Sequence, residues 1–63
     1  MAFSLSQQLE EVERELELRK GVYARQVLSG KMRQSVADYH MSRMQAVRDT
    51  LMSMVNGLVE RSS

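Results

Sequence analysis

The 63-residue sequence contains no cysteine, no proline and no tryptophan, and it has a single histidine. Without cysteine the chain can form no disulfide, and one histidine without cysteine excludes the usual structural zinc sites. No apolar run approaches the roughly 20 residues that a membrane-spanning helix requires. The first eight residues lack the positive start and apolar core of a signal peptide, so we expect a cytoplasmic protein.

An excess of one charge is also lacking, because nine Lys and Arg balance eight Asp and Glu to a net charge of +1. The distribution is uneven, however. Residues 1–18 contain five glutamates and one arginine, whereas residues 19–48 contain seven Lys and Arg and one aspartate. A nearly neutral total does not by itself indicate a polyanionic partner. With one phenylalanine and two tyrosines, the chain also lacks the broad aromatic face of a membrane-surface helix, and no membrane partner is expected.

Motifs that carry catalysis are missing. The sequence has no Gly-rich phosphate loop and no Gly-x-Ser-x-Gly turn. Asp38 and His40 are close in sequence, but residues two apart on a helix point in different directions, so the carboxylate cannot orient the imidazole. We therefore predict that the protein is not an enzyme and has no catalytic residue, no cofactor and no metal site.

The second half of the chain carries the strongest periodic pattern. Residues recur at alternating steps of three and four, at Ala37, His40, Met44, Val47, Leu51, Met54 and Leu58. This spacing places them along one stripe of a helix, as in a helical bundle or coiled coil. Met41, Met52 and Val55 flank the stripe and make the apolar band wider than one neighbouring helix can cover. His40 is interpreted as a stripe residue that fixes register, with a partner contact as the alternative.

The first half predicts a helix of its own over about residues 6–28, with Ser4 or Ser6 as its N-cap. Its apolar stripe becomes polar for one turn near Arg19, and Gly21 is a possible weak point in the helix. Residues 29–32 form the turn, in which Gly30 is the left-handed residue that ends the first helix. The second helix is predicted over about residues 34–58.

Such a short connection favours two antiparallel neighbours, so the predicted fold is all-α, a single helical-hairpin domain over residues 1–63. A chain of this length rarely buries enough apolar surface to be stable alone. Since neither a disulfide nor a metal is available, we expect the hairpin to dimerise into a four-helix bundle or to dock on a larger partner. The core or dimer stripe is predicted to contain Leu9, Val12, Leu16, His40, Met44, Val47, Leu51, Met54 and Leu58.

Several short segments together resemble one group of known proteins. They are Glu13-Arg14-Glu15-Leu16 followed by Arg19, Val22-Tyr23, Gly30-Lys31-Met32, and Met44-Gln45-Ala46-Val47. The pattern is similar to that of small helical proteins of tailed phages and prophages, and it covers roughly residues 9–50. The resemblance implies a phage or prophage origin, an accessory role and a place in the host cytoplasm. It supplies no activity and no site residues.

Protein–protein interaction is the function that these observations favour. The expected protein is a small accessory protein that binds and modulates a larger host or phage protein, and that also pairs with itself. The alternative is a small nucleic-acid-associated regulator, in which basic residues near the turn contact phosphates and a tyrosine stacks on a base. The candidate partner-binding residues are Arg19, Tyr23, Arg25, Lys31, Arg33, Tyr39, Met41, Arg43 and Met52.

Overall fold

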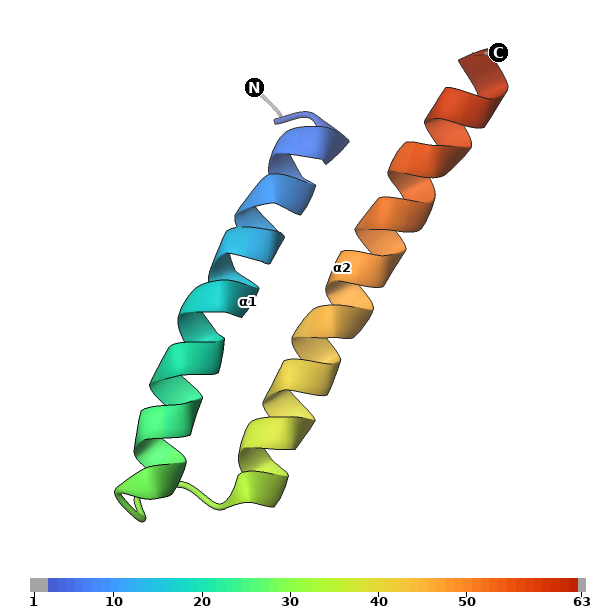
Figure 1. Ribbon diagram of the computed structural model, residues 1–63. Coiled ribbons are helices and arrows are strands. Elements are labelled where there is room, and N and C mark those ends of the chain that lie inside the picture. Colours follow the sequence, from blue (N-terminus) through green and yellow to red (C-terminus); the bar gives the residue numbers. More distant parts are fainter. Residues whose placement is uncertain (1–2, 63) are drawn as a thin grey trace.

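A computed structural model describes the backbone of residues 3–62 and the side chains of residues 3–57. Two helices, α1 (Leu5–Leu28) and α2 (Gln34–Ser62), pack antiparallel and form a helical hairpin. Figure 1 shows them side by side, with the chain ends together at one end and the connecting turn at the other. We call these the open end and the turn end. The all-α hairpin predicted from the sequence is thus confirmed.

Ser4 begins the first helix. Its backbone is extended, its Oγ accepts a hydrogen bond from the Gln7 backbone N–H at 3.1 Å, and Gln7 Oε1 accepts one from the Ser4 N–H at 2.9 Å. This reciprocal pair is a capping box, which satisfies two N–H groups at the helix start. It selects Ser4 over Ser6, and α1 therefore begins one residue before the predicted boundary. The helix then continues through Gly21 without interruption.

Gly30 ends α1 in the way that the sequence predicts. It has a φ of 77°, in the left-handed region where a Cβ would be strained. The Gly30 N–H donates to the Val27 carbonyl at 3.1 Å, and the Lys31 N–H donates to the Gln26 carbonyl at 2.9 Å. These two bonds constitute a Schellman motif, which satisfies carbonyls that the helix end would otherwise leave unpaired. The motif reverses the chain within a few residues.

The second helix starts without a side-chain cap. The carbonyl of Arg33 accepts bonds from the backbone N–H groups of Val36 and Ala37, each at 3.1 Å. From there α2 continues through Gly57 to Ser62, four residues beyond the predicted end at about 58. Since α2 has 29 residues and α1 has 24, its last turns extend past the start of α1, as Figure 1 shows.

Very little of the hairpin is buried. Among the described side chains only Leu9 and Ala37 are buried, at 8% and 3% exposure. Val12, Leu16 and Met44 are half-buried around them. The accessible surface is 5192 Å², whereas a globular monomer of this mass exposes only about 4,200 Å². The hairpin is also elongated, at 49 × 22 × 16 Å. Two helices alone therefore leave much of the apolar band of α2 uncovered.

The rotation of α2 determines which part of that band is covered. Ala37 and Met41 face α1, and Met44 and Leu51 are half-buried beside them. The predicted stripe residues His40, Val47 and Met54 are instead exposed. The apolar band is wider than one neighbouring helix can cover, so its two edges compete for contact with α1. The edge that includes Met41 packs on α1, and the edge that includes Val47 stays exposed. The predicted stripe residue Leu58 has a side chain outside the described ones.

Candidate interaction surfaces

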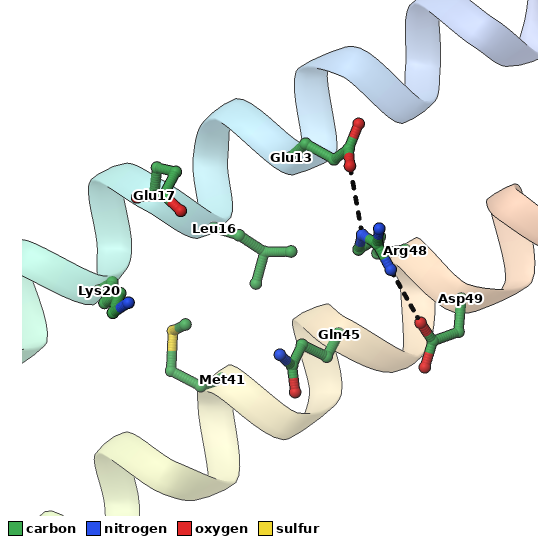
Figure 2. Close-up of a pocket in the computed structure, with 8 residues that line it drawn as sticks. All are labelled: Glu13, Leu16, Glu17, Lys20, Met41, Gln45, Arg48 and Asp49. Carbon is green, nitrogen blue, oxygen red and sulfur yellow. Dashed lines mark hydrogen bonds and ion pairs between the residues drawn. The ribbon is translucent and has the colours of Figure 1, made fainter.

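The line of contact between the two helices separates two faces of the hairpin that differ in chemistry. The first, which we call the charged face, is a groove of about 710 Å³ lined mainly by polar and charged side chains. Figure 2 shows Leu16 and Met41 pointing toward each other across its floor, with the polar groups around them. Its lining residues are Glu13, Leu16, Glu17, Lys20, Met41, Gln45, Arg48 and Asp49.

Arg48 connects the two helices on the charged face. Its Nε lies 3.3 Å from Glu13 Oε2 on α1, and its Nη1 lies 3.4 Å from Asp49 Oδ1 on α2. The side chains of Arg48 and Glu13 are 35% and 45% exposed, so water screens the pair and it contributes only about 0.2–1 kcal/mol. The groove is therefore bordered by charges of both signs, some of them paired across the two helices.

The opposite face combines exposed apolar side chains with aromatic and cationic ones, and we call it the open face. A hollow of about 270 Å³ lies there, lined by Arg19 from α1 and by His40, Arg43, Met44 and Val47 from α2. Val36 and Met54 continue the same side of α2, because they lie four residues before His40 and seven after Val47. Val36, Tyr39, Val47 and Met54 are 40%, 58%, 49% and 49% exposed.

Aromatic and cationic groups gather in the half of the open face nearer the turn. The His40 ring lies between two tyrosine rings, with centroid distances of 6.0 Å to Tyr23 and 5.6 Å to Tyr39. The Arg43 guanidinium lies 5.3 Å from the centroid of the Tyr39 ring. Such a cation–π contact contributes about 0.5–1 kcal/mol at an exposed site. The cluster fixes these side chains against one another across both helices.

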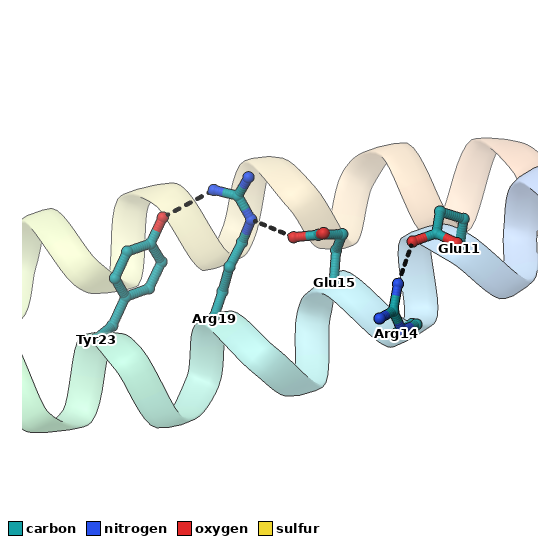
Figure 3. Close-up of polar contacts among 5 residues, drawn as sticks. All are labelled: Glu11, Arg14, Glu15, Arg19 and Tyr23. Atoms are coloured by element: carbon teal, nitrogen blue, oxygen red, sulfur yellow. Dashed lines mark hydrogen bonds and ion pairs between the residues drawn. The ribbon is translucent and has the colours of Figure 1, made fainter.

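Arg19 supplies a permanent positive charge to this cluster. Figure 3 shows its guanidinium between Tyr23 and Glu15, with Nη1 3.2 Å from the Tyr23 hydroxyl and Nε 3.3 Å from Glu15 Oε2. The hydrogen bond to Tyr23 raises the pKa of Arg19, and Glu15 raises the pKa further. An arginine whose pKa lies above its ordinary value stays charged at any pH near neutrality. On the outer side of α1, Arg14 pairs with Glu11 at 3.0 Å.

The turn end carries a third group of charges. Arg25, Lys31 and Arg33 are exposed there, and none of them pairs with an acidic side chain among residues 3–57. Lys31 and Arg33 follow Gly30 in the turn, whose backbone is held by the hydrogen bonds described above. Arg25 lies in the last turn of α1, and its guanidinium extends back toward Gly21. The turn end therefore carries exposed cations on a backbone held by hydrogen bonds.

The structure distributes the sequence-derived candidates among these surfaces. Four lie in the aromatic and cationic cluster of the open face: Arg19, Tyr23, Tyr39 and Arg43. Three lie at the turn end: Arg25, Lys31 and Arg33. Met41 points toward α1, and Met52 is half-buried, so the proposed Met41 and Met52 flank offers little free surface.

Sequence reasoning did not select Glu13 and Arg48, which join the two helices. The available signal was opposite charge beside the apolar stripes, but pairing two such residues requires knowing how the helices are rotated. No group of three or more His, Cys, Asp or Glu that could hold a metal occurs among the described residues, and no helix there is long and apolar enough to cross a membrane. Comparisons of the chain with protein-family models, curated proteins and solved structures find no match.

Proposed function

We propose that the chain is a protein-interaction module: a small accessory protein that pairs with itself and binds and modulates a larger host or phage protein. The observation that carries the proposal is the uncovered apolar band of α2, whose residues Val36, Val47 and Met54 are 40–49% exposed. Exposed apolar side chains along one side of a helix are typical of a surface that another protein covers.

Self-association into a four-helix bundle explains the excess surface. A hairpin of 49 × 22 Å presents a broad side of about 1,100 Å², which exceeds the roughly 800 Å² that each partner contributes to a standard interface. Covering about 800 Å² per copy would reduce the exposed surface from 5192 Å² to about 4,400 Å², close to the value for a globular chain of this mass.

The turn end is the surface we assign to the larger partner. It remains accessible when the open faces of two copies are in contact, because it lies at the extremity of the hairpin. Its exposed cations, Arg25, Lys31 and Arg33, favour an acidic protein surface. The phage or prophage setting is supported by the residue pattern alone, through its resemblance to small helical phage proteins.

Affinity capture from bacterial host lysate tests the larger-partner proposal. The tagged chain should retain a discrete protein after nuclease treatment, and the double variant Lys31→Gln/Arg33→Gln should lose it. The control Ser42→Glu/Ser53→Glu changes the net charge equally, at exposed positions on the outer side of α2. Retention by the turn variant, or loss by the control, would contradict an assignment to the turn end.

A nucleic-acid-associated regulator is the second candidate, and the same exposed cations favour it. The tyrosines favour it less, because Tyr39 already lies under Arg43 and Tyr23 already bonds Arg19. Affinity for DNA or RNA should fall steeply with salt, and Lys31→Gln/Arg33→Gln should reduce the slope of log K against log salt by about 1.8. Absence of binding even at low salt would end this candidate, whereas capture that vanishes with nuclease would favour it.

A further inference from the structure

Charge is separated along the length of the hairpin. Glu15 lies on the half of α1 that leads to the open end, together with the other glutamates of α1. The half nearer the turn contains one acidic residue, Asp38, and six cations: Arg19, Lys20, Arg25, Lys31, Arg33 and Arg43. Arg14 lies among the glutamates and pairs with Glu11. Arg48, which lies further toward the open end, is paired with Glu13 and Asp49.

The open face has charged groups of its own. Arg19 and Arg43 line the same hollow with Val47. The Glu15 carboxylate lies 3.3 Å from the Arg19 guanidinium, whereas Arg43 has no acidic partner among residues 3–57. The side chains of Arg19 and Glu15 are 44% and 40% exposed, so charges on a neighbouring molecule can reach both. A second copy that covers Val47 therefore meets these charges as well.

We propose that the open face binds a second copy of this chain in antiparallel orientation, with the turn end of one hairpin beside the open end of the other. The inference rests on the self-association proposed above and adds its geometry. A parallel pair would place the basic halves of both copies side by side, with the two Arg43 side chains in one region of the interface. An antiparallel pair shifts them toward the acidic half of the partner, where Glu15 lies.

A comparison of the two faces of the hairpin also favours the open face as the dimer interface. On the charged face five charged side chains surround Leu16 and Met41: Glu13, Glu17, Lys20, Arg48 and Asp49. The open face has exposed Val36, Val47 and Met54 along one side of α2. The hairpin is 22 Å broad, so the two helices of one copy can pack against the two helices of the other.

Distances between spin labels test the orientation. The chain has no cysteine of its own, and Leu28→Cys places a single label at the turn end, on a side chain that is 88% exposed and outside the open face. In the antiparallel dimer the two labels lie at opposite ends, about 36 Å or more apart for a helix of 24 residues. In a parallel dimer their separation is close to the 22 Å breadth of one hairpin.

A mixed sample supplies the matched control. Ser6→Cys places a label at the exposed start of α1, and chains labelled there are combined with chains labelled at Leu28→Cys using two distinguishable labels. The antiparallel dimer gives a short distance between unlike labels and a long one between like labels. The reverse pattern overturns the orientation but leaves self-association intact. A folded monomer in sedimentation at micromolar concentration overturns both, and a lysate protein bound to the open face of that monomer identifies a different occupant.

Discussion

Removing two methyl groups from Val47 distinguishes a covered open face from a free one. Val47 is 49% exposed in the hairpin, so half of its apolar surface remains to be covered. Two buried methyl groups contribute about 1.6 kcal/mol, and the half still exposed corresponds to about 0.8 kcal/mol per chain. Val47→Ala should therefore weaken a symmetric dimer by about 1.6 kcal/mol, which is a 10- to 20-fold rise in Kd.

The same substitution should leave the hairpin itself almost unchanged. Within one chain it loses about 0.8 kcal/mol of burial but gains about 0.6 kcal/mol because alanine has the higher helix propensity. Circular dichroism of the variant should accordingly match the parent, while sedimentation equilibrium reports the rise in Kd. The change in Kd can then be attributed to association alone.

Leu18→Ala is the control for this prediction. Leu18 is 53% exposed and lies two residues after Leu16, so it points to the outer side of α1. It should leave Kd unchanged. An unchanged Kd for Val47→Ala, or an equal weakening by Leu18→Ala, would refute the assignment of the open face to the dimer interface.

Three backbone substitutions test the account of the hairpin, each by urea or thermal unfolding. Gly30→Ala should destabilise by about 1 kcal/mol because φ is 77° there, and Gly30→Asn should recover part of the loss; equal stability of parent and alanine variant would contradict the Schellman turn. Gly21→Ala should instead stabilise by about 0.5–1 kcal/mol, since its Cβ would meet only Arg25 Nη1, at 3.7 Å; a loss of stability would show a close contact there. Ser4→Ala should cost about 1 kcal/mol by removing the cap, and Ser6→Ala at the rejected cap position is its control.

The helix ends could be predicted from the sequence because they depend on local chemistry. Ser4 was one of two candidate caps, and its bond to Gln7 resolves the choice. Gly30 is the left-handed residue at the end of α1, as predicted. A serine followed three residues later by glutamine, or a glycine between two periodic segments, specifies hydrogen bonds that form within a few residues. No knowledge of the other helix is needed for either.

The rotation of α2 could not be predicted, because it depends on how two faces compete for one neighbour. Alternating steps of three and four place Ala37, Met44 and Val47 on one stripe, but the row that includes Met41 is also apolar. The structure covers Met41 and exposes Val47. A wide apolar band is consistent with several rotations of α2, and the sequence alone does not choose among them. The contact between Glu13 and Arg48 could not be predicted for the same reason, because it depends on the rotation of α2.

The hairpin and the proposed dimer depend on different kinds of interaction, and salt separates them. Contacts within the hairpin are mainly apolar, with adaptable methionines such as Met41 and Met44 facing or flanking α1. Such contacts do not need a particular ionic strength. The proposed orientation instead depends on the uneven distribution of charge, with the glutamates of α1 toward the open end and cations such as Arg43 nearer the turn. Their interaction range falls from about 10 Å at 0.1 M salt to about 3 Å at 1 M. High salt should therefore leave the helices and the apolar contact intact while it removes the preference for antiparallel over parallel pairs. In the proposed dimer, the apolar surface supplies the contact between the two copies and the arrangement of charge determines their orientation.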